Sequence, residues 1–163
     1  MKLDKINLTT AALAITVGFA TVSFAAGEKE VKITMNQVPA AVQKAVKEYA
    51  SESEIKGIED SEVDGTKVIE FDIEKNGKKS EIAFRNNGKL FSTEEKVTMA
   101  DLPEAVRNTI NEKGAGGKIG TPEKIVQEGK ISYEVIVEKG GKKTEFTISP
   151  KGKVTASEDA GKD

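Results

Sequence analysis

The spacing of hydrophobic residues changes from a helical period to a strand period at two places along the chain. From Val38 to Tyr49, and again from Leu102 to Ile110, apolar residues recur every three or four positions. This spacing is typical of a helix with one buried face. After each helix the period becomes two, over residues 68–85 and 131–148, where apolar residues alternate with charged ones. Alternation of this kind predicts strands with one buried face.

Each alternating segment is interrupted by a two-residue turn, Asn76-Gly77 in the first and Gly140-Gly141 in the second. Such dipeptides favour the tight turn of a β-hairpin. Further strands are expected before each hairpin and, as short strands, after it, near Ile58–Val63, Lys124–Glu128, Leu90–Phe91 and Val154. The pattern therefore predicts an α+β fold in which a helix is followed by an antiparallel β-meander and packs on one face of the sheet.

Capping signals precede both helices. Thr34 is followed three residues later by Gln37, and Thr98 by Asp101, which suits a capping box at a helix start. A proline follows each pair at a position compatible with a first helical turn.

The two patterned regions are copies of each other. Residues 32–94 align without a gap on residues 96–158, at an offset of 64, and the prolines, turn glycines and apolar phase coincide. We predict two tandem copies, residues 31–94 and 95–158, with a polar tail at 159–163; the chain is expected to be disordered from Ala156 onward. A unit of about 60 residues has little core of its own, so the copies are expected to pack on each other.

The N-terminus has the features of a secretory signal peptide. Two lysines precede an uncharged, apolar run from Leu8 to Phe24, and Ser23 and Ala25 place small residues before a cut between Ala25 and Ala26. We therefore predict that residues 1–25 are removed and that the mature chain is periplasmic or secreted, without stable membrane insertion. The alternative is an uncleaved membrane anchor.

Composition narrows the chemistry. The 163 residues include neither Cys nor His, which excludes disulfides, zinc fingers and the Ser-His and Cys-His nucleophile systems. With 25 basic and 27 acidic side chains there is no basic excess to bind nucleic acid. No cofactor or metal is expected, and the chain is predicted not to be an enzyme.

At this point the sequence resembles a known family. VPAAVQKAV followed by DGTKVIEFDIEKNGKKSEIAFRNNGKL, and LPEAVRNTI followed by EGKISYEVIVEKGGKKTEFTISPKGKV, are similar to PepSY-like domains that are also labelled beta-lactamase-inhibitor-like. The resemblance implies a tandem pair of exported domains whose sheets continue into one concave surface. It also implies a non-enzymatic binding or regulatory module that binds or inhibits another exported or envelope protein. The alternative is a structural or stress-related envelope protein without a defined ligand.

The candidate binding surface is the sheet face that the helix leaves uncovered. Alternation places these partner-binding candidates there: Glu70, Asp72, Glu74, Lys79, Glu81, Arg85, Glu134, Ile136, Glu138, Lys143 and Glu145, with Val68 and Ala83 as apolar points. These side chains are expected to be solvated and to bind weakly, with sensitivity to salt. Glu70, Asp72 and Glu74, in the first strand of the first hairpin, could instead form a carboxylate pair or a weak calcium site.

Export is testable on the native protein. The intact mass of the chain purified from its envelope fraction is expected to correspond to residues 26–163. A mass that retains Met1 would contradict both the cleavage and the predicted compartment.

Overall fold

The computed structural model describes residues 30–63 and 65–161, in which two α-helices and two short 3-10 helices accompany ten strands. The first half consists of β1 (Val31–Lys32), η1 (Met35–Gln37), α1 (Ala40–Val46), β2 (Ile55–Val63), β3 (Thr66–Lys75), β4 (Lys78–Arg85) and β5 (Leu90–Lys96). The second half consists of η2 (Met99–Asp101), α2 (Glu104–Gly114), β6 (Lys118–Ile119), β7 (Glu123–Gln127), β8 (Lys130–Lys139), β9 (Lys142–Ile148) and β10 (Val154–Asp159).

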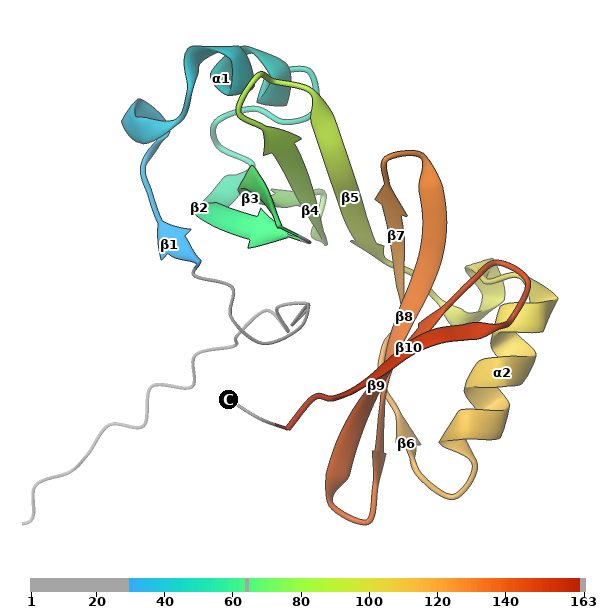
Figure 1. The fold of residues 1–163 in the computed structure, drawn as a ribbon. Helices are drawn as coiled ribbons and strands as arrows, with labels where there is room; N and C mark the ends of the chain where they lie inside the picture. Colours follow the sequence, from blue (N-terminus) through green and yellow to red (C-terminus); the bar gives the residue numbers. More distant parts are fainter. Residues whose placement is uncertain (1–29, 64, 162–163) are drawn as a thin grey trace, which may run out of the picture.

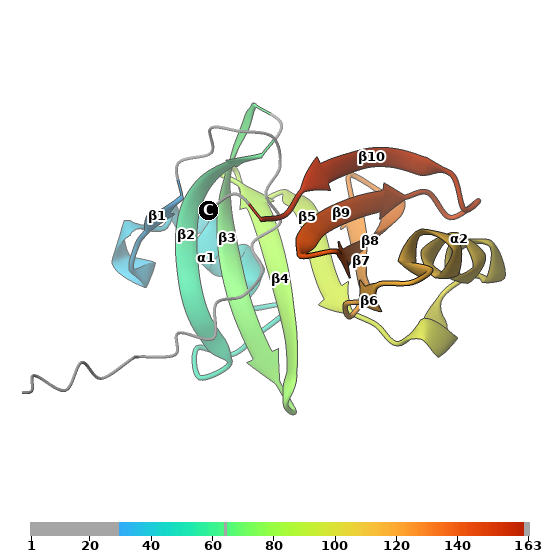
Figure 2. The ribbon, with the colours of Figure 1, turned by 90° about the horizontal axis from the view of Figure 1, so that it is seen from below.

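All ten strands belong to one antiparallel sheet. Its order is β1-β2-β3-β4-β5-β7-β8-β9-β10, and β6 pairs with β8. The halves meet where β5 pairs with β7, from Ser92 opposite Gln127 to Lys96 opposite Glu123. We call this pairing the seam. Figure 1 shows β5 and β7 side by side between the two halves, and Figure 2 shows the same junction from below.

Each helix covers the apolar side of its own half. Val42 and Val46 of α1 pack in one cluster with alternate residues of β3 and β4, including Phe71 and Phe84, whose rings meet edge to face with centroids 6.0 Å apart. Burial of each phenylalanine contributes roughly 1.5–3 kcal/mol. In the second half, Val106 and Ile110 of α2 pack on β8 and β9 through Tyr133, Val135 and Ile148.

The two helices lie on the same face of the continuous sheet. Ile82, a member of the first cluster, is opposite Thr93, which is opposite Val126 across the seam. Val126 is in turn opposite Ile131, two residues before Tyr133 of the second cluster. Directly paired residues share a face, as do alternate residues of one strand. The predicted α+β class with an antiparallel sheet is therefore confirmed.

Both predicted hairpins are present. Asn76 and Gly77 have φ angles of 54° and 74°, and Gly140 and Gly141 have φ angles of 62° and 79°. Positive φ at both central residues is typical of the type I′ turn, whose twist matches that of the two strands it connects.

The capping boxes begin 3-10 helices and not the α-helices. Thr98 Oγ1 donates to Asp101 Oδ2 at 2.6 Å, and the equivalent box of Thr34 begins η1. The residue before each proline is extended, with ψ of 134° at Val38 and 148° at Leu102. Because proline disfavours helical geometry in the preceding residue, the α-helices begin only after it.

The end of the chain is more ordered than predicted. β10 extends to Asp159, so Ala156 lies opposite Thr147 and Asp159 opposite Thr144, and the expectation of disorder from Ala156 is wrong. Pairing with β10 satisfies backbone groups that β9 would otherwise expose at a sheet edge. β5 is likewise longer than the two-residue strand expected, because it continues to Lys96 to form the seam.

Each half has one glycine at the point where the loop after its hairpin meets the helix. A Cβ atom on Gly88 would lie 2.7 Å from the Ala41 carbonyl oxygen, and one on Gly152 would lie 2.6 Å from that of Ala105. Both glycines also have positive φ. Only glycine allows the loop after the hairpin to approach the helix this closely.

The predicted signal peptide, residues 1–25, and its cleavage site lie outside the described residues. The boundaries at 31–94, 95–158 and 159–163 stay predictions.

The continuous sheet predicts that the halves unfold together. Val42→Ala and Val106→Ala delete equivalent, fully buried side chains of the two cores, and each is expected to lower the free energy of unfolding by about 1–3 kcal/mol. Because the seam couples the halves, each variant should shift one common thermal transition, measured by calorimetry. The exposed control Lys44→Ala should leave it in place. Two separate transitions, only one of which moves in each variant, would contradict this coupling.

Candidate functional site

The candidate site is the sheet face opposite α1 and α2, which we call the open face. All eleven predicted partner-binding residues lie on it, on β3, β4, β8 and β9, because their strands pair in the registers that alternation requires. Lys79, Glu138 and Lys143 are exposed there. Those that are half-buried are Glu70, Asp72, Glu74, Glu81, Arg85, Ile136 and Glu145.

The expectation that this face is solvated is wrong at several positions. Glu134 is only 3% exposed, since it lies between Glu123 of β7 and Thr147 of β9, whose hydroxyl donates to Glu134 Oε1 at 3.0 Å. Val68 and Ala83 are buried in a third apolar cluster. The other members of that cluster are Val63 and Phe91.

Carboxyl groups form a continuous line across the open face. We call it the acidic row and define it as Asp72, Glu81, Glu94, Glu123, Glu134 and Glu145, one residue from each of β3, β4, β5, β7, β8 and β9. Three of its five steps are direct cross-strand partners: Asp72–Glu81, Glu81–Glu94 and Glu123–Glu134. The other two steps, Glu94–Glu123 and Glu134–Glu145, join carboxyl groups that interact electrostatically across adjacent strands.

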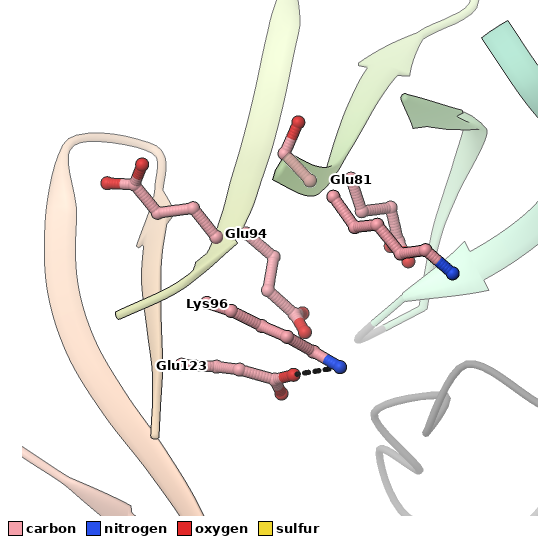
Figure 3. A pocket seen from close by; sticks show the side chains of 7 residues that line it. Glu81, Glu94, Lys96 and Glu123 are labelled. Carbon is pink, nitrogen blue, oxygen red and sulfur yellow. Dashed lines mark ion pairs between the residues drawn. The ribbon is translucent and has the colours of Figure 1, made fainter. Parts of the chain in front are cut away.

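The seam brings the middle of this row together. Glu94 is opposite Ile125, and Glu123 lies two residues from Ile125 on the same face, so their side chains converge from the two halves. They line a cavity of about 20 Å³ together with Glu81 and Lys96 (Figure 3). Lys96 Nζ lies 3.9 Å from Glu123 Oε1. A cavity of this size holds about one water molecule.

The row is electrostatically strained. Burial, reinforced by repulsion from Glu70 and Asp72, raises the pKa of Glu81 to about 8. Burial and the neighbouring charges of Glu123 and Glu81 raise the pKa of Glu94 well above its usual range. Glu94 therefore holds a proton at neutral pH.

The second-half end of the row behaves in the same way. Burial, followed by the hydrogen bond and charge of Glu145, raises the pKa of Glu134, and burial also raises the pKa of Glu145. Glu134 Oε2 is buried and has no donor among the described residues when both carboxyls are ionised. A shared proton is therefore what satisfies this pair in the free protein.

A basic residue connects the halves beside the row. Arg85 of β4 donates to Glu128 Oε1, in the turn after β7, at 2.7 Å, and its guanidinium lies 5.0 Å from the centre of the Phe91 ring. Both partners are partly exposed, so solvent screens the ion pair and it adds little to stability. Hydrogen bonding to Arg85 holds the pKa of Glu128 below its usual range.

A metal site is not indicated. Among residues 30–63 and 65–161, no group of three or more acidic side chains is arranged to hold a metal ion. Over the same ranges, no helix has the length and apolar character needed to span a membrane.

Sequence reasoning missed Glu94, Glu123 and Phe91. If Phe91 is taken as a core residue and the alternation is continued, Glu94 falls on the open face. Nothing in the local sequence, however, indicates that β5 extends that far. A register shift between Ala83 and Phe84 turns Phe91 to the open face. The convergence of Glu94 and Glu123 depends on pairing between two strands that are distant in the sequence, which alternation does not encode.

Comparison with known proteins gives a family and a fold. The model of the family described as "Putative beta-lactamase-inhibitor-like, PepSY-like" matches the chain twice, at residues 24–92 and 68–156. No curated protein matches the sequence.

Two solved structures have similar folds. A putative periplasmic protein from Bacteroides eggerthii DSM 20697 is 20% identical, with a TM-score of 0.61, over 75% of this chain and 88% of that one. A BLIP-like protein from Bacteroides fragilis NCTC 9343 is 23% identical, with a TM-score of 0.57, over 76% of this chain and 86% of that one.

The acidic row predicts that stability falls as pH rises. Carboxyls with raised pKa stabilise the fold fully below the unfolded-state pKa of 4.5, and this contribution is lost as pH increases through their folded-state values, about 8 for Glu81. The melting temperature should therefore be lower at pH 9 than at pH 5.5.

Glu94→Gln, which mimics the protonated side chain, should flatten this dependence and raise the free energy of unfolding at pH 8.5 by about 1–2 kcal/mol. Glu48→Gln, at an exposed position after α1, is the control and should change neither. A melting temperature that is constant or rises from pH 5.5 to 9 would refute the strain assigned to the row.

Proposed function

The chain belongs to the PepSY-like, beta-lactamase-inhibitor-like family, and we propose that it is a non-enzymatic, extracytoplasmic module that binds another exported or envelope protein through its open face. The proposal rests on one feature, a sheet face that carries an unbroken row of partly buried carboxyls. Burying unpaired carboxyls costs free energy. Strained, titratable groups of this kind concentrate at functional sites.

The descriptions of proteins with similar folds also support an extracytoplasmic location. The fold neighbours include a protein described as BLIP-like and one described as a putative periplasmic protein, and both cover about three quarters of this chain. An exported location also agrees with the signal peptide predicted from the sequence.

The size of the cavities favours binding over catalysis. Carboxyls with raised pKa can act as general acids, but the cavity beside Glu81 and Glu94 holds only about 20 Å³. Sites for small molecules are commonly ~300–1,000 Å³. A larger cavity of about 440 Å³ is lined by Ile33, Met35, Ile55 and neighbouring residues, and no carboxyl of the acidic row is among the residues that line it. Protein recognition needs a surface and not a cleft, and the open face offers one.

We further infer that the two halves are copies of one helix-plus-meander unit. The matched capping boxes, the prolines after them and the glycines against each helix support this inference, as does the double match to the family model. Two copies in one sheet would give a surface about twice as wide as either could offer.

Site-specific photo-crosslinking in the producing cell tests the proposal. A photo-reactive amino acid at exposed open-face positions 79, 138 or 143 is expected to give a discrete adduct with an envelope protein. The same residue at exposed helix-side positions 44 and 108 is the control and should give none. Adducts from the helix-side positions alone would show that partners bind elsewhere.

A further inference from the structure

We propose that the acidic row receives a cationic segment of the partner, rich in lysine or arginine. The inference rests on the proposed function and specifies the chemistry of the partner. It is carried by the geometry of the row, by the imbalance of charge around its middle, and by an acceptor atom without a donor.

The row has the extent of a peptide-binding track. Neighbouring strands lie about 4.8 Å apart, so six strands space the carboxyls over roughly 24 Å. An extended segment of about seven residues covers this length. The side chains on one face of such a segment, about four in number, would lie along the row.

Charge is unbalanced at the middle of the row. The cavity beside the seam is lined by four acidic and two basic side chains: Glu81, Glu94, Glu95, Glu123, Lys79 and Lys96. The Glu95 carboxylate is engaged by Lys124 at 3.3 Å, and Lys96 faces Glu123. The groups that face Glu94 are thus Lys79 and Glu81 from β4, Lys96 from β5, Glu123 from β7 and Glu134 from β8. Protons supply the missing positive charge in the free protein.

An unsatisfied acceptor marks the second-half end. Glu134 is only 3% exposed, and its Oε1 accepts from Thr147. Among the described residues, its Oε2 has no hydrogen-bond donor when both carboxyls are ionised. Glu145, the neighbouring group, is itself an acceptor when ionised. An incoming ammonium or guanidinium group would supply a donor for Glu134 Oε2 when the pair is ionised.

Linkage then fixes the direction of the pH effect. A bound cation favours the ionised carboxyl, so a proton leaves the row as the cation arrives, and charge is conserved. Affinity should therefore increase with pH over the range in which the free row is still protonated. This direction is opposite to that of stability, because the row is most strained when it is ionised and empty.

Calorimetric titration of the full mature chain with an octalysine peptide tests the inference. We expect binding that tightens about fivefold or more from pH 6 to pH 8.5. At pH 7.5, the measured enthalpy should differ between phosphate and Tris buffers by the amount that proton release requires. Octaglutamate should not bind.

Paired variants separate the row from net charge. Glu81→Gln with Glu94→Gln should weaken octalysine binding about tenfold and reduce the proton release, because glutamine has no proton to exchange. Glu48→Gln with Glu104→Gln changes net charge equally at exposed positions of the helix side and should leave both unchanged. Glutamine matches the shape of a protonated glutamate, and the melting temperature of each variant verifies that it is folded.

The outcomes distinguish this inference from the proposed function. Equal weakening by both pairs of variants, or binding without proton release, overturns the inference. If open-face crosslinks to a partner persist under that result, the proposed function still holds. Crosslinks from the helix side alone would reject the proposed function, even if octalysine binds the row.

Discussion

The pairing of β5 with β7 is the constraint on which the rest of the structure depends. It joins two small sheets into one, keeps α1 and α2 on a common face, and leaves the opposite face continuous from β1 to β10. The register matters as much as the pairing. Because side chains alternate, a slip of one residue would turn Glu94 away from Glu123 and break the acidic row at its centre.

The protein remains stable although the ionised carboxyls of the acidic row cost free energy on its open face. The fold is supported on the helix side by two apolar clusters built around Val42 and Val106, each fully buried. On the other side it holds carboxyls close enough to share protons, an arrangement that costs free energy when they ionise. The helix-side cores therefore sustain a face that is suited to binding and not to stability. A partner that brings positive charge would relieve the cost that the free protein bears.

Much of the fold follows from local pattern, and the candidate site follows only in part. Asn76-Gly77 and the alternation around it specify the first hairpin, so the open-face positions of Glu70 and Lys79 could be predicted. Burial of Glu134 could not, because it depends on β7 and β9 enclosing it from both sides. The partnership of Glu94 with Glu123 was equally inaccessible, since it arises from strands of different halves. Local preference also misplaced the helix starts, where prolines override the capping signals.

A cysteine pair across the seam tests the central claim most directly, because the native chain contains no cysteine. Thr93 and Val126 are direct partners in β5 and β7, and directly opposed residues have the Cα separation that a disulfide requires. In the Thr93→Cys, Val126→Cys variant, mild oxidation should form an intramolecular disulfide rapidly and nearly completely. The control Thr93→Cys, Ile125→Cys places the second thiol on the opposite face and should not cross-link within the chain. Efficient cross-linking of the control, or only intermolecular products from the first variant, would contradict the seam and the row that it assembles.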